Sequence, residues 1–280
     1  GVDFTSAPRP AKPITVARAQ WVSGGAGGGS GGTVHVEAID RLDSFEAFEA
    51  LLAEPGPWIG GFDFPFGLPR SAVAELGWPL DWVALVGHCA SLSRTEFRAR
   101  LDAHRQARAF GDRYAHRTVD RPAGSHSPLK LVNPPVALMF LEGAPRLARA
   151  GVSVPGMRAG DDARIAIEAY PGYLVRSITR ASYKSDTRSK QTPERAEARA
   201  QVLAALARAD HCLDVALSAA PEILAQAQSD ASGDTLDAIV CALQAGWAAR
   251  QAGFGLPDGV DPLEGWITSA GPGAGSASGA

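Results

Sequence analysis

Residues 58–66 read WIGGFDFPF, a nearly continuous apolar run that contains one charged residue, Asp63. An apolar run of this length without alternation is typical of a central strand that is covered on both faces of its sheet. Pro65 and Gly67 are expected to end the strand. A carboxylate in such a strand is costly to bury unless an ion pair, a hydrogen bond or a metal ion compensates it. The segment therefore predicts a central strand that ends at an acidic residue.

The segments before this strand predict three further strands. ITVARAQWV (14–22) and TVHVEAI (33–39) alternate apolar and polar residues, and the glycine-rich segment 23–32 joins them. We expect a hairpin with a long flexible tip, because such glycine-rich linkers behave as flexible chains. Residues 1–6 add the first strand, so that the chain opens with three consecutive strands.

The rest of the chain is expected to be mostly helical, with one more strand. The predicted elements are a short amphipathic helix at 44–54, a helical insertion at about 71–121, a helix at 134–150, a strand at 163–171 and two last helices at 195–227 and 234–252. The order is β-β-β-α-β, the insertion, and then α-β-α-α. It predicts an α/β fold with a mixed five-stranded sheet and helices on both faces, in the element order of the ribonuclease H-like fold. We expect one domain over 1–270 and a flexible tail at 271–280.

The composition excludes several classes of protein. With 280 residues, 45% of them hydrophobic and 20% charged, the chain has the composition of an ordinary globular protein. Its three cysteines lie far apart without the spacing of a zinc site or a disulfide framework, which predicts a cytoplasmic protein. No apolar run approaches the roughly 20 residues that cross a bilayer, so no membrane partner is expected. The net charge of −3 shows no overall preference for nucleic acid, so any polyanion must be bound by a local basic patch.

Acidic residues stand at the ends of four apolar segments. They are Asp3, Asp63, Glu168 and the pair Asp234 and Asp237. Each has a structural explanation: Asp3 in an ion pair with an arginine, Asp63 in an Asx-turn, and Glu168 on the polar face of an alternating strand. Asp234 would then cap the last helix, with Asp237 in its first turn.

The joint arrangement favours a metal site. Asp3 and Asp63 fall on strands that are neighbours in this fold, and Asp234 and Asp237, three residues apart, share one face of the last helix. Carboxylates that converge in a partly apolar site repel one another and have raised pKa values unless a cation joins them. We therefore expect Mg²⁺ or Mn²⁺, the divalent ions that prefer oxygen ligands.

These residues also carry a resemblance to a known family. The chain resembles domain-of-unknown-function family 429, whose members are described as predicted nucleases with a ribonuclease H-like fold, through the segments GVDFTSAP (1–8), GGFDFPFGLP (60–69), IEAYP (167–171), DTLDAIVCALQA (234–245) and EGWI (264–267). The start of the last helix also resembles that of RuvC-type Holliday-junction resolvases. The resemblance implies that Asp3, Asp63 and Asp237 ligate metal, with Asp234 as a further ligand. Glu168 matches the EAYP pattern of the family but has no counterpart in the resolvases.

The expected activity is metal-dependent hydrolysis of a phosphodiester bond in nucleic acid. The carboxylates would hold two ions about 4 Å apart that activate water and stabilise the leaving oxygen. Thr5 and Ser6 would offer hydroxyl or amide groups to the substrate, unless they are simple turn residues. Lys184, Arg188 and Lys190 would neutralise phosphates, unless they form an ordinary solvated loop.

Two other functions remain open at this point. GVDFTS also resembles the first phosphate loop of actin-like ATPases and sugar kinases, which catalyse phosphoryl transfer. These proteins need two copies of the fold, and only one three-strand unit is predicted here. The second alternative is a catalytically silent nucleic-acid-binding module, against which the acidic residues at all four places argue.

Overall fold

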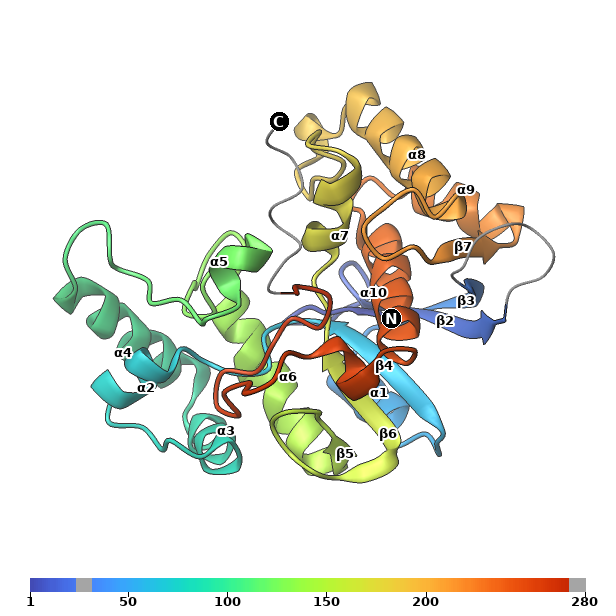
Figure 1. Ribbon diagram of the computed structural model, residues 1–280. Coiled ribbons are helices and arrows are strands. Elements are labelled where there is room, and N and C mark those ends of the chain that lie inside the picture. The colour runs from blue at the N-terminus through green and yellow to red at the C-terminus, as the bar shows by residue number, and fades with distance from the viewer. Residues whose placement is uncertain (24–31, 272–280) are drawn as a thin grey trace, which may run out of the picture.

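The computed structural model describes residues 1–23 and 32–271, which contain one mixed seven-stranded sheet (Figure 1). Its strand order is β5-β6-β4-β1-β2-β3-β7. The strands are β1 (Val2–Asp3), β2 (Ile14–Val22), β3 (Thr33–Leu42), β4 (Trp58–Asp63), β5 (Val152–Ser153), β6 (Asp161–Glu168) and β7 (Ala216–Ala219). The predicted α/β class is confirmed. The predicted hairpin tip and tail lie almost entirely outside the described residues.

The sheet combines an antiparallel and a parallel half. Strands β1, β2 and β3 pair antiparallel in sequence order, whereas β4 pairs parallel to β1 and β6 pairs parallel to β4. The apolar sequence of β4 is explained by this position, because a strand at the centre of a sheet that is covered on both faces exposes neither row of its side chains. In the parallel pair of β1 and β4, Val2 is opposite Phe62 and Asp3 is opposite Asp63.

The expected strand count of five is wrong, because two short strands add to the edges of the sheet. Strand β5 has two residues and pairs with β6, and β7 has four residues and pairs parallel to β3. Segments this short do not show a period of two. The sequence ALSA of β7 also lies in the region 195–227 that was expected to be helical, and it separates two helices there.

The helices follow the predicted order with more interruptions and with one helix, α7, that was not predicted. They are α1 (Phe45–Leu52), α2 (Arg70–Glu75), α3 (Trp82–Ser91), α4 (Arg94–Ala107), α5 (Asp120–Ala123), α6 (Val136–Ala150), α7 (Pro171–Ile178), α8 (Pro193–Ala207), α9 (Pro221–Ser229) and α10 (Asp234–Ala248), with 3₁₀ turns at Arg188–Lys190 and Ala252–Gly255. Pro193 is the first residue of α8, since proline fits the first turn of a helix, where its missing N–H is not needed.

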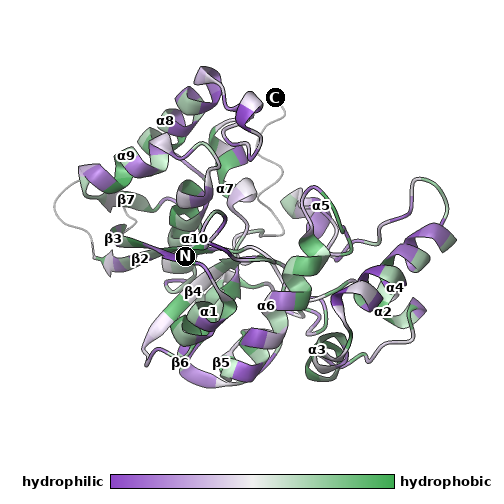
Figure 2. Ribbon diagram, turned by 180° about the vertical axis from the view of Figure 1, so that it is seen from behind, coloured by the Kyte–Doolittle hydropathy of each residue, from purple (hydrophilic) through white to green (hydrophobic). Residues whose placement is uncertain are grey.

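Helices cover both faces of the sheet. On one face, Phe48 of α1 and Phe140 of α6 share a buried cluster with Val2, Val16 and Phe62 of the strands. On the other face, α10 packs against β2 and β3, and residues of α8 belong to the same second cluster. Nearly all of α10 is buried, and in Figure 2 α6 is largely coloured as hydrophobic, whereas α4 carries many hydrophilic residues.

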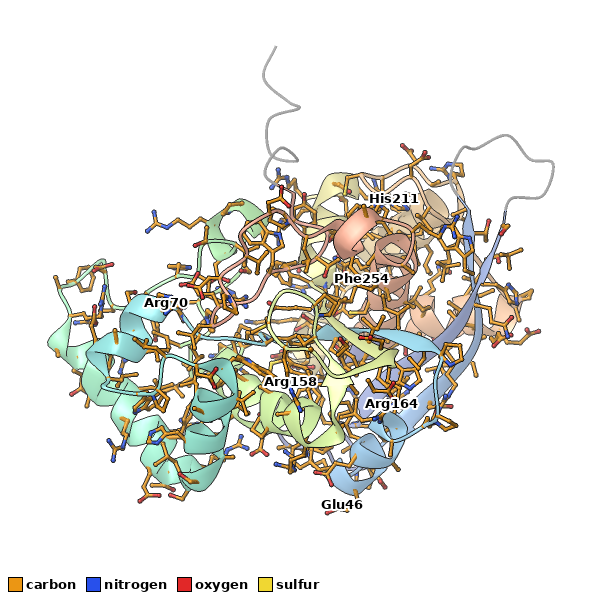
Figure 3. The ribbon with its side chains drawn as sticks, turned by 60° about the horizontal axis from the view of Figure 1, so that its bottom comes forward. Glu46, Arg70, Arg158, Arg164, His211 and Phe254 are labelled. Atoms are coloured by element: carbon orange, nitrogen blue, oxygen red, sulfur yellow. The ribbon has the colours of Figure 1, made fainter. Side chains whose placement is uncertain are left out.

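The helices α2 to α5 form the predicted insertion between β4 and α6. Phe97 of α4 and Leu85 of α3 belong to the same buried cluster as the sheet, so the insertion shares its core. Arg70 of the insertion donates to Asp261 at 2.6 Å and so attaches the C-terminal segment to it, whereas Arg164 of β6 donates to the carbonyl of Leu52 at the end of α1 at 2.9 Å (Figure 3). In the described part of the chain, no helix has the length and apolar character needed to span a membrane.

Candidate metal centre

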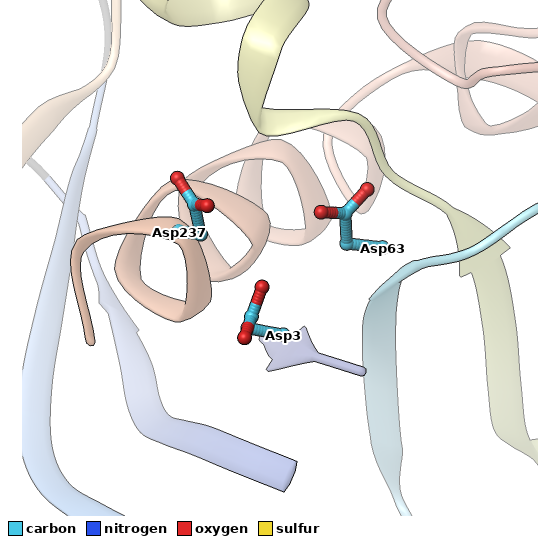
Figure 4. Close-up of side chains that lie close together, drawn as sticks. All are labelled: Asp3, Asp63 and Asp237. Atoms are coloured by element: carbon cyan, nitrogen blue, oxygen red, sulfur yellow. The ribbon is translucent and has the colours of Figure 1, made fainter. Parts of the chain in front are cut away.

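Three aspartates from three elements meet at one point. Asp3 ends β1 and Asp63 ends β4, and their paired register turns both side chains to the same face of the sheet. Asp237 lies in the first turn of α10, which packs against both strands. Carboxylate oxygens of the three residues all lie within 4.8 Å of one another (Figure 4). The convergence expected for these three residues is therefore present in the fold.

The aspartates of α10 do not act as helix caps. The residue before the helix is Gly233, whose φ of 82° lies in the left-handed region, and no side-chain cap bond is made there. The carboxylate of Asp230 accepts hydrogen bonds from the N–H groups of Ser232 at 3.1 Å and Thr235 at 2.9 Å instead. The start of α10 is therefore stabilised by Asp230, which leaves Asp234 and Asp237 available for the site.

Burial and mutual repulsion disfavour the ionised form of the carboxyl groups in this site. The pKa of Asp63 is raised to about 7, chiefly by burial and further by Asp237 and Glu168, although Lys184 opposes the shift. The pKa of Asp3 is raised well above its usual value by burial and then by Asp234 and Asp237. Within the described residues, no group donates a hydrogen bond to the carboxylate of Asp3 or Asp63. A cation would supply the compensation that these carboxylates lack.

Asp237 differs from the other two because it has protein partners. The ammonium of Lys184 donates to one of its oxygens, and the hydroxyl of Tyr183 donates to the other at 2.6 Å. Gly233 makes room for this lysine, since a Cβ atom there would lie only 2.7 Å from the Cβ of Lys184. Lys184 was expected either to neutralise phosphates or to lie in an ordinary solvated loop, and the structure pairs its ammonium with Asp237 of the acidic site.

Asp234 lies beside the three aspartates and is held by another lysine. Its oxygens accept hydrogen bonds from Nζ of Lys12 at 3.1 and 3.2 Å, and the same Nζ donates to Asp186 at 2.8 Å. The charge of Asp234 contributes to the raised pKa of Asp3, so it is close enough to influence the site. It is not one of the three converging aspartates.

Glu168 is engaged in a buried ion-pair network. Its two oxygens each accept from the guanidinium of Arg117 at 2.7 Å, and one also accepts from the N–H of Phe66 at 2.9 Å. Arg117 pairs in addition with Asp120 at 2.9 Å. Both side chains of the Arg117–Glu168 pair are almost fully buried, at 2% and 4% exposure. Glu168 therefore borders the site and raises the pKa of Asp63, while burial raises its own pKa and the guanidinium of Arg117, shared with Asp120, opposes that shift.

Of the expected substrate-binding residues, some line the cavity and others do not. Thr5 and Ser6 line the cavity next to Asp3. The hydroxyl of Ser6 accepts a hydrogen bond from Arg94 at 3.2 Å. Arg188 and Lys190 lie on an exposed 3₁₀ turn and do not line this cavity.

The acidic site opens into a cavity of about 560 Å³. Lys12, Arg117 and Tyr183 also line it, and sequence reasoning missed all three. No spacing in the sequence distinguishes these three residues from surface residues. Lys12 is a single lysine after a turn, Arg117 lies inside the insertion, and Tyr183 is next to Lys184. Their roles arise only from contacts with residues far away in the chain.

Comparison with known proteins adds one finding. A family model described as "Protein of unknown function (DUF429)" matches residues 17–261, a range that contains Asp63, Glu168, Asp234 and Asp237 and begins after Asp3. Comparisons with curated proteins and with solved structures gave no match.

Proposed function

Because the chain belongs to this family of unknown function, its activity must be argued from the site, and we propose that it is a metal-dependent nuclease that hydrolyses phosphodiester bonds. The observation that carries the proposal is the convergence of Asp3, Asp63 and Asp237 within 4.8 Å from two paired strands and a helix. Asp3 and Asp63 are half-buried and Asp237 is buried, and carboxylates at such distances repel one another unless a cation joins them.

The topology of the inner sheet supports a ribonuclease H-like assignment. The five inner strands follow the order β3-β2-β1-β4-β6, with an antiparallel β1-β2-β3 unit and parallel β4 and β6. The sequence predicted a mixed sheet that begins with three consecutive strands, and the order of the strands across the sheet comes from the structure. The edge strands β5 and β7 would then be additions to that core.

The residues fit a hard divalent ion. All three offer carboxylate oxygens, which Mg²⁺ and Mn²⁺ prefer, and Mg²⁺ binds oxygen at roughly 2.0–2.1 Å. A bound ion would supply Lewis acidity to a phosphoryl oxygen and lower the pKa of water. Tyr183 and Lys184 orient Asp237, and Lys12 holds Asp234 beside Asp3. A second ion, if bound, would draw on Asp234.

The two alternative functions receive less support. Phosphoryl transfer of the actin and sugar-kinase type needs a second three-strand unit, and residues 1–23 and 32–271 contain one sheet with one such unit. A silent binding module would gain nothing from mutually repelling carboxylates whose pKa values are raised.

The proposal is tested with a panel of labelled single-stranded, duplex, hybrid and branched nucleic acids. The purified chain is incubated with Mg²⁺, Mn²⁺ or EDTA. Cleavage is expected only with metal, and Asp3→Asn, Asp63→Asn and Asp237→Asn should each remove nearly all of it, because the ligands of one site act as a unit.

Arg188→Gln and Lys190→Gln serve as controls, because both residues are exposed and lie outside the cavity. They should retain most of the turnover. Hydrolysis of ATP without cleavage of any nucleic acid would transfer the assignment to phosphoryl transfer.

A further inference from the structure

The cavity continues well beyond the acidic residues. From Asp3 and Asp63 its lining passes to the start of α7 and then to the segment 125–139, which leads from the insertion into α6. We call this far part the distal arm and define it by His126, Pro134, Pro135, Val136, Met139 and Tyr170, which all line the cavity. The insertion therefore supplies a wall that faces the acidic site.

One side of the distal arm is apolar. Pro134, Pro135, Val136 and Met139 line it in sequence, and the last three are only partly buried. Rigid proline rings and a polarizable thioether form a surface suited to a flat apolar ligand. An exposed apolar surface inside a cavity is usually covered when the ligand binds.

His126 and Arg176 line this end of the cavity, and Lys130 contacts His126 from outside the lining. Nζ of Lys130 lies 3.4 Å from Nε2 of His126. Burial, followed by the neighbouring Lys130, His116 and Arg176, lowers the pKa of His126, so the positive charge at this end comes from Lys130 and Arg176. Within the described residues, no acidic side chain forms an ion pair with His126, Lys130 or Arg176. This end of the cavity is therefore suited to an anionic group.

The two ends of the cavity thus call for different parts of one ligand. The acidic end suits a phosphate that is bound through a cation, and the distal arm offers an apolar wall followed by positive charge. A polynucleotide offers matching groups in the same order, because each base is flanked by the phosphates on either side of it along the strand. Charge complementarity and the apolar wall therefore point to the same class of ligand.

We propose that the distal arm binds the nucleotide next to the scissile phosphate of a single-stranded nucleic acid, with the unpaired base on the apolar wall and its phosphate at His126 and Lys130. The inference rests on the proposed nuclease function. An unpaired base exposes its faces to such a wall, whereas the bases of a duplex are stacked on one another. A cavity of about 560 Å³ accommodates a ligand of drug or nucleotide size but not a double helix.

Binding to the full chain tests this inference separately from cleavage. Fluorescence anisotropy is measured with a labelled single strand of about ten nucleotides and with the duplex of the same sequence. The buffer contains Ca²⁺, and the nucleic acid is checked afterwards to show that it has not been cleaved. The single strand should bind at least about tenfold more tightly. Lys130→Gln and His126→Gln should each weaken its binding roughly three- to tenfold, and Lys130→Gln should lower the salt slope by about 1.

Two further variants separate the contributions. Val136→Ser should weaken binding of the single strand severalfold and leave the salt slope unchanged, because it alters only the apolar wall. Arg100→Gln removes a positive charge from the exposed face of α4 and should leave binding as in the wild type.

Equal affinity for duplex and single strand would overturn the inference, and so would a loss in Arg100→Gln as large as that in Lys130→Gln. If the wild type cleaves nucleic acid but the distal-arm variants bind normally, only this inference fails. If single-strand binding depends on Lys130 and Val136 but metal never supports cleavage, the proposed nuclease function fails and the binding site stands.

Discussion

Asp3 and Asp63 are direct partners in the parallel register of β1 and β4, at the point where both strands end. The fold thus fixes two carboxylates side by side, and α10 adds Asp237 above them. Neither strand residue has a hydrogen-bond donor among the described residues. The metal-free protein therefore carries unfavourable electrostatic free energy at this site, and this has measurable consequences.

Neutralising one of the paired aspartates should stabilise the metal-free protein. Asp63→Asn keeps the shape of the side chain but removes a charge whose pKa is raised by burial and by Asp237. We expect its melting temperature in EDTA to rise by a few degrees relative to the wild type. Mg²⁺ or Mn²⁺ should then raise the melting temperature of the wild type more than that of the variant, as linkage requires.

Asp258→Asn is the matched control, because Asp258 is exposed and does not line the cavity of the site. It should change neither the melting temperature in EDTA nor the shift of the melting temperature on adding metal. Equal metal-induced shifts in the wild type and in Asp63→Asn would remove Asp63 from the ligand set.

The stability of the metal-free protein should fall as the pH rises through neutrality. The folded pKa of Asp63 is about 7, against a usual value of 3.8, so the folded state binds this proton more tightly than the unfolded state. The resulting stability is fully present below about pH 4 and is lost as the pH passes 7. Each pKa unit corresponds to about 1.4 kcal/mol, so the effect amounts to a few kcal/mol at most. Asp3 contributes in the same direction.

The measurement is the melting temperature in EDTA between about pH 5 and 8. Asp63→Asn should flatten the curve, and saturating Mg²⁺ should do the same, because metal binding displaces the protons. A wild-type curve that rises over this range would contradict the raised pKa values.

Replacing Lys184 should make the protein depend more strongly on a divalent ion. Lys184→Met leaves the buried Asp237 with Tyr183 as its remaining hydrogen-bond donor. The metal-free variant should lose about 1 kcal/mol, because the lysine side chain is 43% exposed and its ion pair is partly screened. The shift of the melting temperature on adding Mn²⁺ should exceed that of the wild type by a few degrees.

Lys190→Met tests whether this effect is specific, because Lys190 lies in the same loop and is exposed. Its metal-induced shift should equal that of the wild type. If Lys184→Met also matches the wild type, Lys184 does not compete with the metal for Asp237.

Glu168→Gln should act on stability more than on chemistry. The change weakens a buried pair in which Arg117 contacts Glu168 through two bonds of 2.7 Å, and breaking such pairs costs about 3 kcal/mol. Asp120 remains as a partner of Arg117. Chemical denaturation measures the loss, and turnover per folded molecule with Mg²⁺ should stay within about tenfold of the wild type. A folded variant without turnover would show that Glu168 takes part in catalysis.

The sequence by itself determined the central elements of the fold. The alternation in 14–22 and 33–39 and the apolar run from Trp58 are properties of consecutive residues, so β2, β3 and β4 follow directly from them. The placement of acidic residues at the ends of such segments also drew attention to Asp3, Asp63, Glu168, Asp234 and Asp237, since a charge in an apolar segment needs a partner.

Only the tertiary structure decided which partners these acidic residues have. Lys184 reaches Asp237, Lys12 reaches Asp234 and Arg117 reaches Glu168 across separations of 53, 222 and 51 residues. The same holds for β5 and β7, which are too short for a periodic pattern and form because neighbouring strands offer free edges. Local sequence records periodicity and burial. Ion pairs between residues that are distant in the chain, and the pairing of strands at the edges of the sheet, depend on how the packed layers bring these segments together. No local sequence pattern encodes this.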